Sequence, residues 1–585
     1  MTIGTTSRPT FSAAERAPHA HRRGRDGCAV LAPALALLIA AWPGPASAQL
    51  ARLWSAGFNG AHGALDAASA VAVDLAGNAY VAGGSMQADS TFRGVVLKFD
   101  PGGALVWRHL FVGPGVADWL THVRVDQAGH VIAGGVSQEP DTTLRAVWFK
   151  LTPGGGLLWT QRDAGPSATL LADLEVGPGD AVYATRIEAH APLPWPHGLL
   201  PPAAVMTTRC SPAGTPLWTA FGTTRSPVAA LAIDPAGNAY VVTSGLGDTL
   251  GLPYHKDILV TKHDAATGAL QWSTGYDSPG HGDEAAVAAA LGASGHLFVT
   301  GTSVPAGDSL PSRMLTLQID PAGSVVWSAL RANANTLVPA ALAVAPGDEV
   351  YVAGRACSDC DGCGIELVKY GLGGSLQWER EVPALKTGGT AAAADVALDA
   401  LGNPFVAGVA SGPSFQSLDM LVAAYSSAGT LVDVDHYDAG GRGDEPADCE
   451  VHPDGSLYVA GTSAIPGADQ DVALLKYAPV PVTVPNSPGR PAVVSVEAYP
   501  NPGTLRTVRF ALPERSRVSL VVHDLAGRVV HEAFRDRVFE AGVHSAPIAG
   551  ARLADGVYFL RLSGRALNAD GAQVESARRA VIIRR

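Results

Sequence analysis

The chain has 585 residues, a formal net charge of −12 and 47% hydrophobic residues. An acidic balance of this size disfavours binding to the phosphates of nucleic acid. The 67 glycines and 42 prolines suit many short strands joined by tight turns, and no long amphipathic segment with helix caps interrupts them. We therefore expect an all-β protein that binds no nucleic acid.

Residues 1–48 form a predicted secretory signal peptide. Three arginines within residues 22–25 precede an apolar run over residues 28–41, and the small-residue cleavage sequence ASA ends at Ala48. The apolar run is too short to span a bilayer comfortably, and no other segment of the sequence is long and apolar enough. We expect the mature protein to be secreted.

A repeat of about 54 residues fills residues 49–480. Each copy contains an apolar strand, an Asp-x-x-Gly type of turn, two further strands, a second glycine turn and a strand that carries Trp. The copy from Ala68 reads ASAVAVDLAGNAYVAGG and then GVVLKFDPGGALVW. Eight copies of the first turn begin at Asp74, Asp126, Gly177, Asp234, Gly292, Ala345, Asp399 and His452. Repeats of this length with four short strands predict a β-propeller.

The two ends of this region complete one another. The eighth copy stops at ALLKYAPV without a fourth strand, whereas ARLWSAGF at the beginning carries Trp54 with no strands before it. In the seventh copy, Asp433 stands where the other copies have Trp. We therefore expect eight blades, the last of them shared by the N- and C-terminal strands so that no sheet edge stays open.

Acidic residues recur at one register before the first strand of four blades. They are Asp66, Asp118, Glu284 and Asp444. In a propeller this register lies near one mouth of the ring, where carboxylates could bind Ca²⁺, the one cofactor that the sequence suggests. The alternative is that each acid accepts backbone N–H groups at a loop corner, and its absence from half the blades favours this alternative.

Three cysteines stand in one loop of the sixth blade, which reads ACSDCDGCG and contains Cys357, Cys360 and Cys363. Secretion favours a disulfide among them. The alternatives are unpaired thiols or a thiolate-bound metal, which would need a fourth ligand that no neighbouring residue offers. Cys210 and Cys449 are distant in sequence, and five cysteines beyond the signal peptide leave at least one thiol free or intermolecular.

The longest insertion of the ring, residues 186–205, carries Trp195 among prolines. An exposed Trp in a long loop is a candidate ligand contact, and packing over a blade edge is the alternative. The sequence contains no G-x-S-x-G, H-E-x-x-H or Gly-rich phosphate-loop motif. We therefore name no catalytic residue.

The composition changes after the ring. Residues 481–492 are a Pro-rich, stiff linker. Residues 493–585 contain 14 Arg, no Lys and 9 acidic residues, whereas residues 49–491 contain 22 basic and 42 acidic residues. Alternation such as that of Val518, Leu520 and Val522 predicts a small β-sandwich in this tail.

Short motifs give both parts a family resemblance. The tail resembles FlgD-type immunoglobulin-like domains and the type A C-terminal sorting domains of the type IX secretion system, through YPNP (499–502), DLAGR (524–528) and DGVY (555–558). The ring is similar to SBBP-type β-propeller repeats through its D-x-x-G-N-x-Y-V-x-G core. These resemblances imply export through the C-terminal domain and a place in the medium or on the outer cell surface of a bacterium.

Two functions remain open at this point. The first is a secreted or cell-surface propeller, monomeric and non-enzymatic, that binds a protein or glycan as an adhesion or scaffold module. The second is a hydrolase or lyase whose site is built from loops at one mouth of the ring. We favour the first, because no catalytic motif is present.

Overall fold

The structure is a computed structural model, and the residues that it describes run from 50 to 583 with gaps. The gaps are 61–62, 114, 166, 190–202, 225–227, 247–255, 280, 306–311, 333–335, 359–361, 383–389, 412–417, 441–442, 465–469, 480–494, 500–506, 513–514, 526, 540–541, 548–555 and 568–572. The predicted signal peptide and linker therefore lie outside the described residues, as do Trp195 and Cys360.

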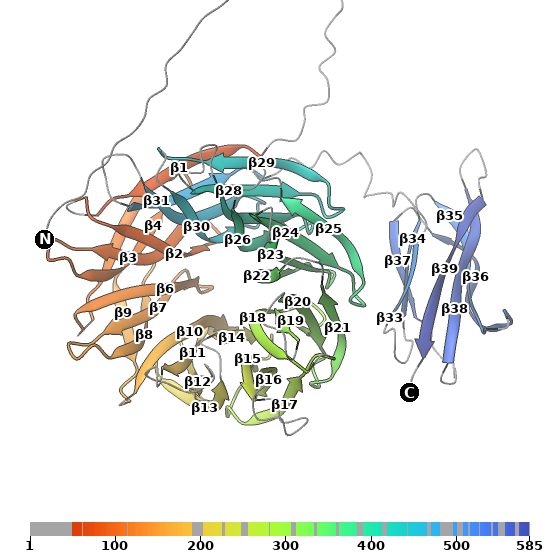
Figure 1. Cartoon of the computed structure of the whole chain (residues 1–585), viewed down its shortest axis with the longest axis horizontal. Helices are drawn as coiled ribbons and strands as arrows, with labels where there is room; N and C mark the ends of the chain where they lie inside the picture. Colours follow the sequence, from red (N-terminus) through yellow and green to blue (C-terminus); the bar gives the residue numbers. More distant parts are fainter. Residues whose placement is uncertain are drawn as a thin grey trace, which may run out of the picture. The chain divides into compact units, whose positions relative to one another are not determined.

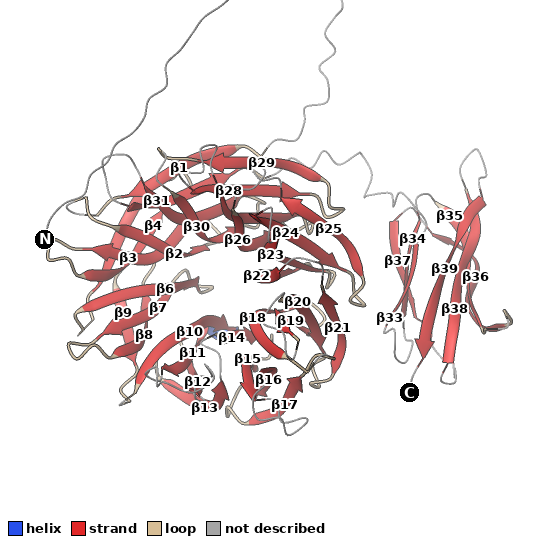
Figure 2. Ribbon diagram, in the orientation of Figure 1, coloured by secondary structure: helices blue, strands red, loops and turns tan. Residues whose placement is uncertain are grey.

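The described chain is all-β, with nine four-stranded sheets and one three-stranded sheet (Figures 1 and 2). Its one helical turn among these residues is the 3₁₀ turn Pro178–Asp180. Eight of the four-stranded sheets lie between residues 52 and 477 and follow one another around a β-propeller-like ring. We number these sheets 1 to 8 in the order in which their first strands occur.

Sheets 1 to 4 are built from consecutive strands. Sheet 1 contains β2 (Asp66–Val73), β3 (Ala79–Met86), β4 (Phe92–Phe99) and β5 (Leu105–Phe111), and sheet 2 contains β6 (Ala117–Val125), β7 (Val131–Gln138), β8 (Leu144–Leu151) and β9 (Leu157–Arg162). Sheet 3 contains β10 (Ala168–Gly177), β11 (Ala181–Ala189), β12 (Ala203–Cys210) and β13 (Pro216–Thr224), and sheet 4 contains β14 (Ala230–Ile233), β15 (Ala239–Leu246), β16 (Lys256–His263) and β17 (Leu270–Tyr276).

Sheets 5 to 8 repeat the pattern, except that the last sheet takes a strand from the other end of the ring. Sheet 5 contains β18 (Asp283–Leu291), β19 (Leu297–Val304), β20 (Arg313–Ile319) and β21 (Val325–Arg331), and sheet 6 contains β22 (Thr336–Val344), β23 (Val350–Ser358), β24 (Gly362–Tyr370) and β25 (Leu376–Val382). Sheet 7 contains β26 (Ala391–Leu398), β27 (Pro404–Ser411), β28 (Leu418–Tyr425) and β29 (Leu431–Tyr437), and sheet 8 contains β30 (Asp444–Val451), β31 (Leu457–Ala464), β32 (Gln470–Tyr477) and β1 (Arg52–Phe58).

Strand β1 closes the ring. It pairs antiparallel with β32, with Trp54 opposite Lys476 and Phe58 opposite Val472, and so becomes the outer strand of sheet 8. This pairing satisfies the backbone groups that the edge of β32 would otherwise expose. It also ties the first strand of the ring to the last.

Apolar side chains fill the spaces between neighbouring sheets. Tyr80 and Ala82 of sheet 1, for example, pack with Val123 and Val147 of sheet 2 in one buried cluster. The alternation of the strands places these side chains, since successive residues of a strand point to opposite faces. Figure 1 shows the first strand of each sheet on the inner side of the ring.

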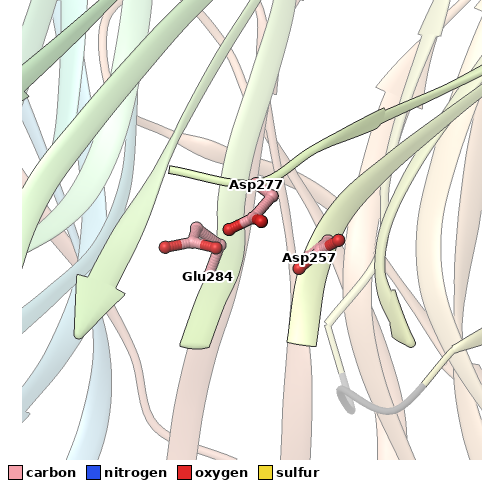
Figure 3. Close-up of side chains that lie close together, drawn as sticks. All are labelled: Asp257, Asp277 and Glu284. Atoms are coloured by element: carbon pink, nitrogen blue, oxygen red, sulfur yellow. The ribbon is translucent and has the colours of Figure 1, made fainter. Parts of the chain in front are cut away.

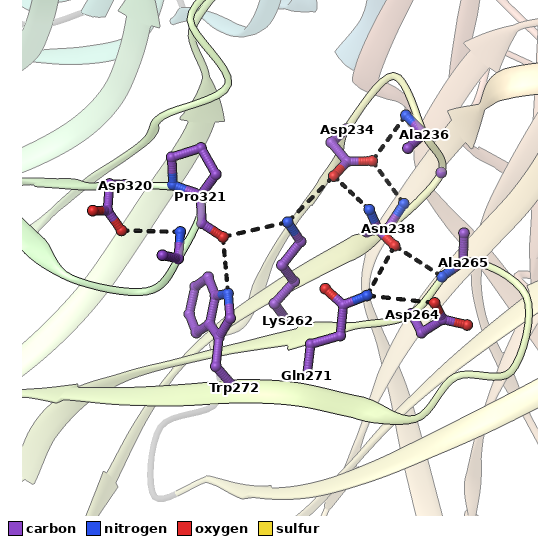
Figure 4. A network of polar contacts seen from close by, with 12 residues as sticks. Asp234, Ala236, Asn238, Lys262, Asp264, Ala265, Gln271, Trp272, Asp320 and Pro321 are labelled. Atoms are coloured by element: carbon purple, nitrogen blue, oxygen red, sulfur yellow. Dashed lines mark hydrogen bonds and ion pairs between the residues drawn. The ribbon is translucent and has the colours of Figure 1, made fainter.

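In seven of the eight ring sheets a tryptophan of the outer strand contacts the next sheet, as Figure 4 shows for Trp272. Trp272 Nε1 of sheet 4 donates a hydrogen bond to the Pro321 carbonyl oxygen of sheet 5 at 3.0 Å, and Lys262 Nζ approaches the same oxygen at 3.5 Å. Seven junctions have this tryptophan bond, at 2.9–3.2 Å: Trp54 to Pro101, Trp107 to Pro153, Trp159 to Pro212, Trp218 to Ala265, Trp272 to Pro321, Trp327 to Leu372 and Trp378 to Ser427. At the eighth, Asp433 accepts the Leu50 N–H at 2.9 Å.

The tail is a separate pair of sheets. The three-stranded sheet has the order β33 (Ser495–Tyr499), β34 (Thr507–Leu512) and β37 (Gly542–Pro547). The four-stranded sheet has the order β36 (Val529–Phe539), β35 (Ser516–His523), β38 (Gly556–Ala566) and β39 (Gln573–Ile583). Phe510, Val518, Leu520 and Leu562 belong to one fully buried core. None of the described segments is a helix with the length and apolarity that crossing a membrane requires.

Candidate functional site

The four acids singled out in the sequence lie at the beginning of inner strands β2, β6, β18 and β30. All four are buried, with at most 1% of each residue exposed. Each stands opposite a serine of the next strand: Asp66 opposite Ser85, Asp118 opposite Ser137, Glu284 opposite Ser303 and Asp444 opposite Ser463. The four therefore occupy one structural register, as the sequence predicts.

One oxygen of each carboxylate binds the loop that enters the strand. Asp118 Oδ2 accepts the Gly113 N–H at 3.1 Å, and Asp444 Oδ2 accepts the Ala439 N–H at 3.0 Å. Asp66 Oδ2 accepts the Gly60 N–H in the same way. Glu284 Oε1 accepts the hydroxyls of Ser278 and Ser303 at 2.7 and 2.8 Å. These contacts are the loop-corner arrangement, and burial raises the pKa of Asp66 and of Glu284.

A second set of charged residues, not recognised in the sequence, lines the ring axis. Two positions of each inner strand, two residues apart, occupy equivalent places in the eight sheets, and in seven of the sheets the first position directly follows a β-bulge. The first position holds Ala70, His122, Asp173, Ala230, Ala288, Ala341, Asp395 and Asp448, in chain order, and the second holds Ala72, Arg124, Glu175, Ala232, Ala290, Ala343, Ala397 and Glu450. Nine of these sixteen positions are alanine, and the other seven are charged or His.

The charged positions gather in one sector, which we call the acid sector. It comprises sheets 7, 8, 1, 2 and 3, and it contains Asp173, Glu175, Asp395, Asp448 and Glu450 together with His122 and Arg124. Sheets 4, 5 and 6 have only alanine at both positions. The ring axis is therefore polar on one side and apolar on the other.

The acids of this sector reach sideways over the next inner strand. Asp448 Oδ2 accepts the Val71 N–H at 2.9 Å, and Glu450 Oε2 accepts the Val73 N–H at 3.0 Å. Asp173 and Asp395 make equivalent bonds to the backbones of β14 and β30.

Arg124 is the central cation of the acid sector. Its Nε and Nη2 donate to Glu175 Oε1 at 3.1 and 2.7 Å. Attraction to Glu175, and more weakly to Asp173 and Asp448, raises the pKa of Arg124. His122 Nε2 lies 3.8 Å from Asp173 Oδ1. Burial lowers the pKa of His122 to about 4, so its imidazole is neutral at pH 7. The acid sector thus contains one arginine and five carboxyl groups.

Three carboxyl groups of the sector have raised pKa values. Burial, and then repulsion from Asp395, raises the pKa of Asp448 well above its ordinary value. Burial also raises the pKa of Glu450 to about 7 and raises that of Asp173. The ionised forms of these three groups are therefore unfavourable in this environment.

The sequence contained a signal for this sector. Inner strands read AVAV, LAI and AAAL in sheets 1, 4 and 5, but HVRV, DLEV and DCEV in sheets 2, 3 and 8. Comparing equivalent positions of the copies would have singled out the charged ones. Their contacts were not readable, because they depend on how far each side chain reaches over the next inner strand.

The cysteines occupy two kinds of environment. Cys357 at the end of β23 and Cys363 at the beginning of β24 stand opposite each other and form a disulfide. Cys210 and Cys449 are free and buried. Burial, and then the neighbouring carboxyl of Asp395, raise the pKa of Cys449 well above its usual range, so this thiol is not a reactive thiolate.

Comparison with known proteins identifies no family. No protein-family model and no curated protein matches the chain. Among solved structures, the chain is similar to polysaccharide lyase Uly1 at 10% identity and a TM-score of 0.39, over 71% of this chain and 90% of that one. It is also similar to a puromycin hydrolase S511A mutant, at 14% identity and a TM-score of 0.38, over 68% of this chain and 59% of that one. A third similar structure is a protein of unknown function from Dyadobacter fermentans, at 10% identity and a TM-score of 0.32, over 52% of this chain and 93% of that one. These likenesses are too weak to assign a function.

Proposed function

We propose that this protein is a secreted, non-enzymatic binding module whose acid sector holds a cationic segment of a partner protein. The observation that carries the proposal is the five-to-one excess of carboxyl groups over arginine on one side of the ring axis. Ionising Asp173, Asp448 and Glu450 without a cation is unfavourable, as their raised pKa values indicate. Groups held in such a state are enriched at functional sites.

Lysine or arginine side chains of a partner match this site. A cation beside the carboxylates would favour their ionised forms, and the low local dielectric would strengthen the attraction. The acidic composition of residues 49–491 would also attract a basic partner from a distance.

The binding test uses the full-length protein and a lysine-rich peptide, titrated in a calorimeter. We expect Glu450→Gln and Asp173→Asn each to weaken binding several-fold, and the affinity to fall with added salt. Glu445→Gln is the matched control, because Glu445 lies on the same strand as Glu450 but is exposed. Equal affinity of wild type and both acid-sector variants would refute the site.

We further propose that the eight ring sheets are the blades of an eight-bladed propeller, and that the tail is an immunoglobulin-like sorting domain. The repeat, the sheet order and the tail motifs support this. In a bacterium with type IX secretion, a chain ending at Pro491 should fold and keep its ligand but remain in the periplasm. Normal surface display of this truncated chain would contradict a sorting role and would indicate that the tail is only a spacer.

A hydrolase or lyase is the second candidate, and the raised pKa of the Asp448 carboxyl group, which lies on an inner strand of the ring, favours it. A carboxyl group that keeps its proton near neutral pH can act as a general acid. Incubation with a panel of polysaccharides would reveal cleavage. Activity that is abolished by Asp448→Asn and retained by Glu445→Gln would favour the enzyme over the binding module.

A further inference from the structure

Two junctions between ring sheets gather three carboxylates each. At the junction of sheets 4 and 5, oxygens of Asp257, Asp277 and Glu284 all lie within 4.8 Å of one another (Figure 3). At the junction of sheets 7 and 8, Asp419, Asp438 and Asp444 have the same spacing. The members correspond: one from the third strand, one directly after the fourth strand and one from the inner strand of the next sheet.

The buried member of each group has one oxygen without a hydrogen-bond donor in the described part of the chain, as Asp66 and Asp118 at the equivalent register also have. Glu284 and Asp444 are completely buried, and each binds the protein through one oxygen. Glu284 Oε2 and Asp444 Oδ1 have no hydrogen-bond donor among the described residues. Asp277 is similar: its Oδ2 accepts from His281 Nδ1 at 2.6 Å, while its Oδ1 is without a donor in the described part of the chain.

The junction of sheets 1 and 2 shows what this position accommodates. The residue equivalent to Asp257 and Asp419 there is Arg93, at the same register of the third strand. Arg93 Nη1 lies 3.1 Å from Asp118 Oδ2, so the protein places its own cation beside the buried acid. At the junctions of sheets 4 and 5 and of sheets 7 and 8, an aspartate stands at this register where sheet 1 has Arg93.

We propose that each of the two three-carboxylate junctions binds one Ca²⁺ ion. Carboxylate oxygens are the ligands that Ca²⁺ prefers, and its flexible coordination lets water complete a site with three protein ligands. Figure 3 shows the Glu284 and Asp277 carboxylates next to each other, with Asp257 facing them from β16. Each ion joins two adjacent sheets, because its ligands come from both sides of a junction. The sites are distinct from the acid sector and independent of the ligand proposed for it.

The stoichiometry of binding tests the proposal. Full-length protein is freed of divalent cations with a chelator and titrated with CaCl₂ in a calorimeter. We expect two ions per chain, with dissociation constants in the range of about 10⁻⁴–10⁻³ M typical of extracellular modules. Glu284→Gln should leave one ion, and Glu284→Gln with Asp444→Asn should leave none. Asp118→Asn is the control, since its junction already contains Arg93, and it should still bind two.

A stability measurement separates ion binding from a purely structural role. In chelator, Glu284→Gln should melt no lower than wild type, because it removes repulsion and keeps an oxygen for Ser278 and Ser303. In millimolar Ca²⁺ the order should reverse, since only wild type gains stability from the ion at this junction. Absence of Ca²⁺ binding by wild type, or binding that survives in the double variant, would overturn the proposal.

Discussion

Gly323 tests whether the tryptophan contacts between sheets govern ring stability. Gly323 has a φ of +92°, a conformation that L-residues adopt at a cost of about 1–2 kcal/mol. A Cβ atom here would lie 2.7 Å from Trp272 Cδ2 and 2.9 Å from Cε3, so the indole must move in Gly323→Ala. Its movement would strain the hydrogen bond to Pro321, worth about 1 kcal/mol, and overpacking adds about 1–3 kcal/mol.

Gly295 provides the matched control. Its φ of +79° is also left-handed, but an added Cβ would lie no closer than 3.7 Å, to Pro321 Cγ. Gly295→Ala should therefore lower the free energy of unfolding only by the cost of holding alanine in a left-handed conformation, about 1–2 kcal/mol. We expect Gly323→Ala to lower the free energy of unfolding by roughly 2 kcal/mol more than Gly295→Ala does.

Urea unfolding monitored by circular dichroism measures both changes in the free energy of unfolding, provided that this free energy depends on urea concentration with the same slope in wild type and variants. A double-variant cycle sharpens the test. In a Trp272→Ala background, Gly323→Ala should cost no more than Gly295→Ala, because the indole that it displaces is absent. Equal losses for the two glycine variants in the wild-type background would refute the idea that Gly323 is required by the tryptophan contact.

Three further outcomes are expected. Burial holds the pKa of Glu450 at about 7 in the folded protein against about 4.5 in the unfolded chain, so the free energy of unfolding of wild type should fall as the pH rises between these values. Glu450→Gln should lack this fall and should be more stable than wild type by at most about 3 kcal/mol above pH 7. Parallel pH–stability curves for the two proteins would refute this role of Glu450. Deleting residues 49–58 removes β1 and the Trp54 bond, and should lower the melting temperature sharply, so an unchanged value would contradict ring closure by β1. Cys357→Ser removes a disulfide between residues six positions apart and should lower the free energy of unfolding by about 2 kcal/mol, measured by chemical denaturation. Peptide mapping of wild type without reduction should find the Cys357–Cys363 link, and its absence would contradict the pairing.

The sequence by itself determined the local architecture. Turns such as DLAGN and DPAGN fix their hairpins through nearby bonds: Asp74 Oδ1 accepts the N–H groups of Ala76 and Asn78, and Gly77 takes the φ of +80° that the turn requires. Four of the eight copies begin this turn with Asp, at Asp74, Asp126, Asp234 and Asp399, and the recurrence of strands and turns made the hairpins within a sheet readable. The two unfinished ends, with Trp54 at one and ALLKYAPV at the other, also indicated how the ring would close.

Only the tertiary structure decided which charges meet. Asp257, Asp277 and Glu284 belong to three different strands or loops, and Arg93 and Asp118 are 25 residues apart, yet each set converges where one sheet packs on the next. The acid sector depends on closure, because Asp448 binds Val71 across 377 residues of chain. Spacing along the sequence contains no information on these distances, because they are set by how far each side chain reaches across a junction between sheets.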